Sequence, residues 1–364
     1  MEMECSMLRE LVKTVSRTVP IPLMAIIEAT KECNLNCPYC RRGNPNSISK
    51  VYPNRNLTPE ALVLILHKIP TLLRIDFMQE GEPLCNPFLP QLLELTSSRG
   101  IQVGITTNGT LITPEIVRFW KAHKVNRVAI SLDSPDEEEY ERMRPPAKFY
   151  RVIESCKLVK NGGLNLQLNT ILFQENIKNT LTFVKLAYIL GASTVNLARA
   201  HFYDTSTTDY HPPLDSEENL DILYSVFAFN SSLKKPMTFF KPLYLESYFR
   251  KCAWPFVAPV IGLDGDIFPC DYTYDTPLGR TEIIEGNEFK VPCNNYKMGN
   301  IYKDNFYKIW FDRDYSSLRT LLKDTEEPEG IFVPVEDIVT TYNKGLSNRF
   351  DFCKVCAWRH GLVC

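Results

Sequence analysis

The order of apolar and amphipathic segments between residues 22 and 200 constrains the fold of this chain more than any other feature. Apolar runs of strand length, beginning with "PLMAIIEAT", alternate there with helical stretches such as "TPEALVLILHKI" and "TPEIVRFWKAHK". Thr58 is a suitable helix N-cap, and Gly100 is a suitable helix stop. Buried strands joined by helices favour a parallel sheet, open or closed into a barrel. Six such units predict an α/β fold, a partial (β/α)6 barrel with about three-quarters of the TIM barrel's units.

The alternation stops after "HPPLDSEENLDILYSVFAFN", which we predict to be a further helix. Beyond it, "VIGLDGDIFPC" is typical of a β-hairpin turning at Asp264-Gly265, and "NFYKIWFDRDYSSLRTLLKD" of an amphipathic helix. We therefore expect an N-terminal helical extension (1–21), the partial barrel (22–231), a linker (232–250) and a small α+β domain (251–364).

The charge and hydropathy of the chain exclude several classes of partner. A net charge of −2 in 364 residues gives no reason to expect nucleic acid or an anionic membrane surface. No apolar run approaches the length of a transmembrane helix, so we expect no membrane association. The first residues, "MEMECSMLRELVKTVSRTV", lack the apolar core of a signal peptide, which predicts a cytoplasmic location.

Three of the twelve cysteines form the motif C-x3-C-x2-C in "ECNLNCPYC", directly after the first predicted strand. In a reducing compartment, clustered cysteines bind metal more often than they form disulfides. A tetrahedral zinc site needs four ligands, and no fourth cysteine or histidine lies near Cys33, Cys37 and Cys40. A [4Fe–4S] cluster takes one thiolate per iron, so three cysteines would leave one iron open. The alternatives are three buried cysteines or half of a zinc site completed by distant ligands.

The cysteine motif, with Tyr39 before its third cysteine, resembles that of the radical SAM superfamily. The resemblance implies that the open iron binds S-adenosylmethionine and that a cluster electron cleaves it to methionine and a 5′-deoxyadenosyl radical. That radical would abstract a substrate hydrogen, and the electron would come from a flavodoxin- or ferredoxin-type reductant. The cofactor supplies the difficult chemistry, and the protein supplies binding and orientation.

Polar residues at later strand ends match further motifs of that superfamily. "QEGEPL" resembles its glycine–glutamate loop, which implies that Gly81, Glu82 and Pro83 approach the SAM amino group, although Glu80 replaces the first of two usual glycines. "TTNGTL" and "SLDS" offer short polar groups for the ribose and carboxylate, although Asn108-Gly109 is also a common turn dipeptide. The full set of candidate cofactor-binding residues is Tyr39, Gly81, Glu82, Pro83, Thr107, Asn108, Ser131, Asp133, Asn169, Val195, Leu197 and Arg199.

Some of these candidates have equally simple structural explanations. Arg199 could pair with the SAM carboxylate or act on an anionic substrate group, but it could also be a surface arginine. Val195 and Leu197 could line an adenine pocket or be ordinary strand residues. Cys85 is a candidate hydrogen donor to a substrate radical, against the alternative of a small buried residue.

A second set of cysteines lies in the last third of the chain. Cys252 and Cys270 flank the predicted hairpin, and Cys353 and Cys356 form a C-x2-C pair. This pattern resembles the SPASM or "twitch" extension of radical SAM proteins, and four thiolates complete one auxiliary [4Fe–4S] cluster that is closed to SAM. A zinc site is the alternative. Cys293 and Cys364 remain without an assigned role.

Together these features predict a radical SAM oxidoreductase whose auxiliary cluster accepts an electron from the substrate radical. About thirty residues precede Cys33, too few for a fused leader-peptide-binding domain, which lowers the expectation of a peptide substrate without excluding it. The reduced twitch form with one auxiliary cluster favours a small polar substrate such as a sugar, aminocyclitol or nucleoside-like precursor. The alternatives are a ribosomal peptide maturase that forms cross-links, thioethers or inverted centres, and a non-catalytic iron–sulfur or zinc protein.

Overall fold

The computed structural model describes residues 20–40, 56–200, 209–211, 213, 216–240, 254–274, 280–284, 287–291 and 296–323. Within these residues the dominant element is a sheet of ten strands in the order β12-β9-β8-β1-β2-β3-β4-β5-β6-β7, and β10 and β11 form a separate antiparallel pair. The run from β8 to β7 is parallel throughout, and β9 and β12 are antiparallel at one edge. The strands are β1 Met24–Ile27, β2 Arg74–Phe77, β3 Gln102–Thr107, β4 Val125–Ser131, β5 Asn165–Leu172, β6 Thr194–Arg199, β7 Thr238–Phe240, β8 Val260–Ile261, β9 Asp266–Phe268, β10 Arg280–Ile284, β11 Asn287–Val291 and β12 Gly299–Asn300.

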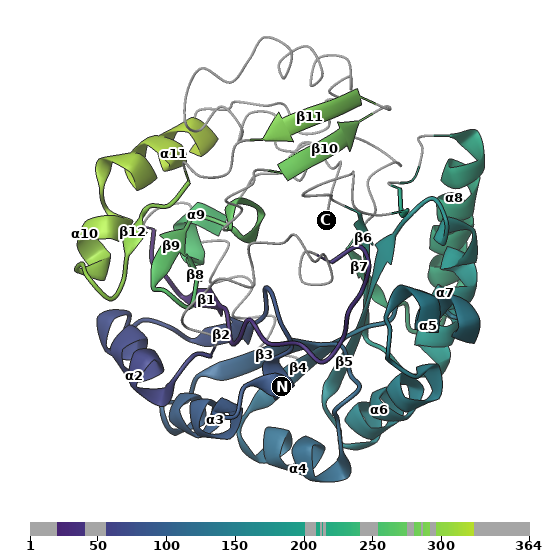
Figure 1. Ribbon diagram of the computed structural model, residues 1–364, viewed down its shortest axis with the longest axis horizontal. Coiled ribbons are helices and arrows are strands. Elements are labelled where there is room, and N and C mark those ends of the chain that lie inside the picture. Colours follow the sequence, from purple (N-terminus) through teal and green to yellow (C-terminus); the bar gives the residue numbers. More distant parts are fainter. Residues whose placement is uncertain are drawn as a thin grey trace.

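Helices α2 to α8 lie on the outer side of the curved sheet (Figure 1). Thr58 caps α2 by accepting a hydrogen bond from the Ala61 amide, and Gly100 follows α3 at a φ of 76°, as expected of a helix stop. The helices are α2 Pro59–Lys68, α3 Leu89–Ser98, α4 Pro114–Ala122, α5 Glu137–Met143, α6 Phe149–Asn161, α7 Thr180–Ile189, α8 Glu217–Ser232, α9 Trp254–Val257, α10 Phe306–Trp310 and α11 Arg313–Lys323, with 3-10 turns η2 Pro83–Cys85, η3 Ile177–Asn179 and η5 Asp271–Thr273.

The six predicted strands are present as β1 to β6, and the predicted partial barrel is confirmed. The expectation of a linker over 232–250 needs one correction, because β7 lies in it and extends the parallel sheet beside β6. The Asn230 side chain bonds to both the amide and the carbonyl of Met237, which holds the connection from α8 to β7. A strand of three residues is too short to show a periodicity in the sequence.

The predicted hairpin is also confirmed, as β8 and β9 with Gly265 at a φ of 81° in the turn. It does not stand apart from the barrel, since β8 pairs in parallel with β1 through Ile26 and Ile27. The hairpin therefore places Cys270 next to the barrel.

The two faces of the barrel strands differ in polarity. Residues such as Ile75, Ile105 and Val128 face the helices and form the main core, where they are fully buried. The alternate positions face the inner side of the curved sheet, which we call the lumen, and are mostly polar. The lumen positions used below are Arg74, Asp76, Gly104, Thr106, Arg127, Ser131, Gln167, Asn169 and Asn196.

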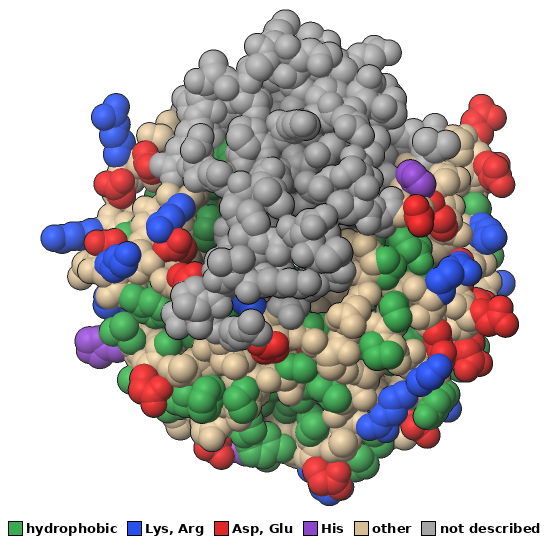
Figure 2. Space-filling view, in the orientation of Figure 1, with side chains coloured by type: hydrophobic (Ala, Val, Ile, Leu, Met, Phe, Trp, Pro, Cys, Tyr) green, Lys and Arg blue, Asp and Glu red, His purple; other side chains and the backbone are tan. Residues whose placement is uncertain are grey.

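The charged side chains of the described surface are mixed in sign. On the face shown in Figure 2, acidic and basic side chains alternate around the rim, over the helices. Among the described residues, no helix is both long and apolar enough to cross a membrane.

Candidate active site

A cavity of about 400 Å³ lies at the carboxyl ends of the strands, where parallel α/β proteins place their sites. Its walls come from the segments that follow β1 to β3 and from the ends of β4, β5 and β6. The lining residues are Cys33, Leu35, Cys37, Tyr39, Cys40, Met78, Gln79, Glu80, Gly81, Glu82, Thr106, Thr107, Asn108, Ser131, Arg144, Ile171, Phe173, Ala198, Ala200 and Tyr274. All three cysteines of the predicted cluster motif are among them.

Leu35 in the cysteine loop is buried and packs into the main core. The Cys40 amide donates to the Cys37 carbonyl at 3.0 Å, which brings both thiols to the same side. No disulfide forms among the described cysteines, and burial raises the pKa of Cys37 to about 12. No three His, Cys, Asp or Glu side chains in the described part surround a single ion position. A cluster does not need such a position, because each thiolate binds a different iron.

The glycine–glutamate loop after β2 is packed directly against the backbone of the cysteine loop. Gly81 has a φ of 74°, and a Cβ there would lie 2.2 Å from the Thr30 carbonyl oxygen and 2.7 Å from that of Glu32. The Glu82 amide donates to the Glu32 carbonyl at 2.7 Å. Glycine is therefore required here for a backbone–backbone contact, which keeps the two loops in fixed relation.

The Glu82 carboxylate joins the loops after β2 and β3. It is 1% exposed and accepts hydrogen bonds from the Thr107 hydroxyl at 2.7 Å, the Asn108 amide at 2.6 Å and the Leu84 amide at 3.1 Å. Burial raises its pKa, against the effect of these donors. The Asn108 side chain in turn donates to Asn34 in the cysteine loop at 2.9 Å. Three loops that are far apart in sequence thus form one rigid wall of the cavity.

A second polar cluster lies behind the opposite wall and contains Asp133. Asp133 is 2% exposed and does not line the cavity, because its carboxylate accepts from Tyr39, from Arg144 Nε at 2.6 Å and from the Ile171 amide at 2.8 Å. Arg144 itself lines the cavity and was not among the predicted residues. Nothing in the neighbouring sequence separates Arg144 from arginines such as Arg142, which is mostly exposed. The contact with Asp133 in the folded protein is what sets Arg144 apart. Asp133 therefore orients a cavity cation, and its direct contact with the cofactor stays a prediction.

Glu80, which replaces a glycine of the family loop, belongs to a buried charge cluster. Lys31 is 3% exposed and lies 2.8 Å from a carboxylate oxygen of Glu28 and 3.2 Å from one of Glu80. The Tyr274 hydroxyl donates to Glu28 at 2.5 Å, and its ring lies under the Lys31 ammonium. Because Tyr274 lines the cavity four residues after Cys270, this cluster joins the predicted auxiliary-cluster segment to the cavity wall.

Val195 and Leu197 do not line the cavity, and their place at an adenine pocket stays a prediction. Both are fully buried in the core between sheet and helices. Ala198 and Ala200 line the cavity, and residues at odd positions of the same strand face the other way. The side chain of Arg199 lies outside the described part of the chain.

The remaining predictions fall near the cavity or outside the described residues. Asn169 faces the lumen beneath the cavity, and Pro83 is buried at the start of η2. Cys85 does not line the cavity and lies 4.0 Å from the Asn34 side chain, and its role as a hydrogen donor stays a prediction. Cys252, Cys293, Cys353, Cys356 and Cys364 are outside the described residues.

Comparison with known protein families agrees with this geometry. A family model for the radical SAM superfamily matches residues 27–187, and one for an iron–sulfur cluster-binding domain, SPASM, matches residues 252–330. Residues 27–187 of this chain form a radical SAM domain. The two domains imply S-adenosylmethionine and [4Fe–4S] clusters as cofactors, one SAM-binding and one auxiliary. The SPASM match includes Cys252 and Cys270 and ends before Cys353.

Several curated radical SAM relatives are enzymes. An AdoMet-dependent heme synthase of Methanosarcina barkeri is 30% identical over 47% of this chain and 48% of its own length. A PqqA peptide cyclase of Streptomyces rochei is 31% identical over 51% of this chain and 50% of its own. The chain thus matches about half the length of these relatives, whose names support an enzymatic role.

Solved structures of similar fold include Streptococcus suis SuiB bound to S-adenosylmethionine, with a TM-score of 0.62, 17% identity and coverage of 86% of this chain and 71% of that chain. Native anSMEcpe with bound AdoMet has a TM-score of 0.62 and 17% identity, and the match covers 84% of this chain and 85% of the other. At these identities the likeness concerns the fold alone.

The residues present fit the implied SAM-binding cluster. Three soft thiol ligands line one cavity, and its walls also carry the polar groups of Asn108 and Ser131 and the cation of Arg144. For the auxiliary cluster, Cys270 is the one predicted ligand within the described residues.

Proposed function

We propose that this protein is a radical SAM oxidoreductase whose cavity holds S-adenosylmethionine at a [4Fe–4S] cluster ligated by Cys33, Cys37 and Cys40. The observation that carries the proposal is the convergence of these three cysteines with Gly81 and Glu82 on one cavity. When bound, the cluster and SAM supply an electron and a 5′-deoxyadenosyl radical, which removes a hydrogen atom from the substrate.

The protein residues bind and orient the cofactor and keep water out. Arg144 is held by Asp133 with its guanidinium at the cavity wall, where it can bind a carboxylate. Ser131 and Asn108 offer hydrogen-bonding groups, and the Gly81 backbone forms part of the same wall. Tyr39 and Phe173 both line the cavity, and their rings pack with centroids 4.8 Å apart. Asn169 and Arg199 are further proposed cofactor ligands.

We also propose that Cys252, Cys270, Cys353 and Cys356 ligate the auxiliary cluster, which accepts the second electron of a two-electron substrate oxidation. Support comes from the SPASM match and from the contact of Tyr274 with the buried Lys31–Glu28 pair. That contact joins the segment after Cys270 to the cavity wall, where the substrate radical would form.

For the substrate we favour a small polar molecule, a sugar, aminocyclitol or nucleoside-like precursor of a natural product or cofactor. The single set of four C-terminal cysteines, enough for one auxiliary cluster, supports this choice. The second candidate is a ribosomal peptide, which the similarity to PqqA peptide cyclases favours. A flavodoxin- or ferredoxin-type protein is the proposed reductant.

Cofactor binding and SAM cleavage test the proposal. The anaerobically reconstituted protein is expected to bind two [4Fe–4S] clusters and, once reduced, to form 5′-deoxyadenosine from SAM. Cys33→Ala, Cys37→Ala and Cys40→Ala should each lose one cluster and all cleavage. Cys156→Ala is the matched control, because Cys156 is buried in the core on α6, away from the cavity. Cleavage by a Cys37→Ala variant, or none by the wild type with either substrate class, contradicts the proposal.

The substrate classes are separated by deuterium transfer. Labelled sugars and aminocyclitols are compared with labelled peptides, and mass spectrometry detects the label in 5′-deoxyadenosine. Transfer from peptides alone would replace the small-molecule proposal with the peptide one.

A further inference from the structure

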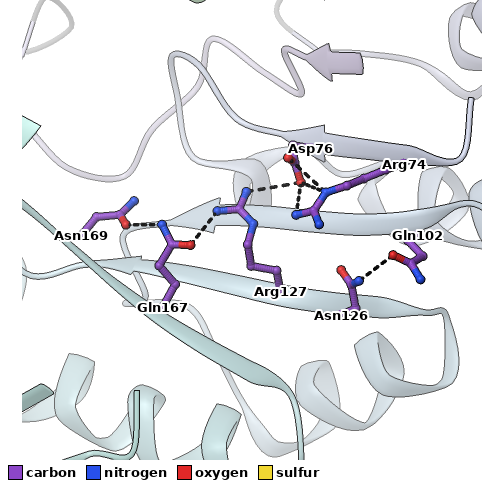
Figure 3. Close-up of polar contacts among 7 residues, drawn as sticks. All are labelled: Arg74, Asp76, Gln102, Asn126, Arg127, Gln167 and Asn169. Atoms are coloured by element: carbon purple, nitrogen blue, oxygen red, sulfur yellow. Dashed lines mark hydrogen bonds and ion pairs between the residues drawn. The ribbon is translucent and has the colours of Figure 1, made fainter. Parts of the chain in front are cut away.

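The lumen of the barrel holds a ladder of polar side chains that begins with two arginines and one aspartate (Figure 3). Arg74 Nη2 lies 2.9 Å and Arg127 Nη2 3.3 Å from the same carboxylate oxygen of Asp76. Burial disfavours the charge on Asp76, but Arg127 and Arg74 outweigh it and lower its pKa. Gly104 makes room for this pair, because a Cβ there would lie 1.9 Å from Asp76 Oδ1. The position of the Arg127 guanidinium is therefore fixed by charge and by packing.

From Arg127 the ladder continues through two side-chain amides. Arg127 Nη1 donates to Gln167 Oε1 at 3.2 Å, and Gln167 Nε2 donates to Asn169 Oδ1 at 2.7 Å. A guanidinium has only donors, so Gln167 must turn its oxygen toward Arg127 and its NH2 group toward Asn169. Asn169 must then accept from Gln167 through its oxygen. The directions of the hydrogen bonds beyond Arg127 follow from its guanidinium, which cannot accept.

The free end of this ladder lies beside residues that line the cavity. Asn169 is half-buried and pairs in register with Ser131, which lines the cavity, as does Ile171 two residues along β5. On the other side, Asn169 pairs with Asn196, whose Oδ1 is buried and has no partner among the described residues. In Figure 3 the amide nitrogen of Asn169 points away from Gln167. The lumen beneath the cavity therefore presents an oriented donor and has unused capacity for a polar group.

We propose that Arg127 and Gln167 are positioning residues that hold the Asn169 amide as a hydrogen-bond donor toward an acceptor atom of the nucleoside bound in the cavity. This inference rests on the proposed function, since it assumes that an adenosyl ligand occupies the cavity. An asparagine without a fixed partner presents its oxygen or its nitrogen with similar ease, whereas the ladder presents the nitrogen alone. The site thereby selects an acceptor over a donor at this point of the ligand.

The test reverses the ladder by one isosteric change. In Gln167→Glu the carboxylate still accepts from Arg127 but cannot donate to Asn169, which then turns its NH2 group toward Glu and its oxygen toward the ligand. The control is Gln102→Glu. Gln102 Oε1 already accepts from Asn126 Nδ2 at 2.9 Å, so this variant adds the same charge beside the ladder without changing the ladder (Figure 3).

The probe is S-adenosylhomocysteine, titrated calorimetrically into the oxidised, cluster-loaded protein, where no turnover occurs. We expect Gln167→Glu to raise the Kd about tenfold, which corresponds to about 1.4 kcal/mol. Gln102→Glu should stay within twofold of the wild type, with the thermal midpoints of both variants measured as a folding control. If Gln167→Glu fails to fold, Asn169→Asp serves instead, because it keeps the bond from Gln167 and loses only the outward donor.

Each outcome of the titration decides a different point. Wild-type affinity in folded Gln167→Glu, or in Asn169→Asp, overturns the positioning role. An equal loss of S-adenosylhomocysteine affinity in Gln102→Glu also overturns it, because the added negative charge in the lumen would then explain the effect. A wild-type protein that loads its clusters but does not bind S-adenosylhomocysteine overturns the proposed function itself.

Discussion

Replacing Gly81 with alanine probes the contact between the glycine–glutamate loop and the cysteine loop. The new Cβ would lie 2.2 Å from the Thr30 carbonyl oxygen, well inside the 3.0 Å below which real Cβ contacts are essentially never found. Both loops must separate to admit it, which breaks the 2.7 Å hydrogen bond from the Glu82 amide to the Glu32 carbonyl. The cysteines would then lose their fixed relation to the rest of the cavity.

The magnitude follows from three contributions. A left-handed backbone costs alanine about 1–2 kcal/mol. Overpacking adds about 1–3 kcal/mol, and the lost hydrogen bond adds about 1 kcal/mol. Gly100→Ala isolates the first contribution, because Gly100 has nearly the same φ, 76°, and its Cβ would meet only the Lys124 ammonium at 3.9 Å. The two variants should therefore differ by about 2–4 kcal/mol in the free energy of unfolding.

Thermal unfolding of the cluster-free protein measures this difference. At about 2 °C per kcal/mol for a chain of this size, the midpoint of Gly81→Ala should lie roughly 4–8 °C below that of Gly100→Ala. The iron and sulfide content after reconstitution should fall in Gly81→Ala alone. Equal midpoints and equal cluster loading in the two variants would refute the argument that a backbone contact requires this glycine.

Three further predictions concern single side chains. Asp76→Asn should destabilise the cluster-free protein by about 3 kcal/mol at neutral pH. Because the folded Asp76 carboxyl has a lowered pKa, the difference in unfolding free energy between wild type and variant should narrow as the pH falls below the ordinary pKa of 3.8. Urea titrations at several pH values would show whether it does. Arg144→Met leaves the buried Asp133 charge without its cation, so it should lower the free energy of unfolding in urea by about 3–5 kcal/mol. It should also weaken S-adenosylhomocysteine binding, and unchanged binding would argue against a cavity role for Arg144. Cys85→Ala should keep full SAM cleavage and product formation, and continued cleavage without product would restore this thiol as a hydrogen donor.

Much of the fold could be read from the sequence because its signals are local. The apolar strand runs, the caps at Thr58 and Gly100 and the turn at Gly265 each depend on a few neighbouring residues. β7 was missed for the same reason, since three residues carry no periodicity.

The candidate site divides along the same line. The spacing of Cys33, Cys37 and Cys40 predicted their common wall, because the six positions between the first and third cysteine limit how far they can separate. The sequence did not predict which polar side chains line the cavity, because this depends on hydrogen-bond and ion-pair partners that are distant in the chain. Glu82 binds Thr107, 25 residues away, and Asp133 turns its carboxylate to Arg144.

By itself, the sequence determined the alternation of strands and helices, the open set of three cysteines and the type of chemistry that such a set supports. Only the tertiary structure decided that Asp133 supports Arg144, that Val195 and Leu197 face the helices, and that Arg127 sets the direction of the Gln167–Asn169 hydrogen bond. The reason is physical. Periodicity and ligand spacing act over a few residues, whereas the facing of a strand and the pairing of a buried charge are settled when distant segments pack.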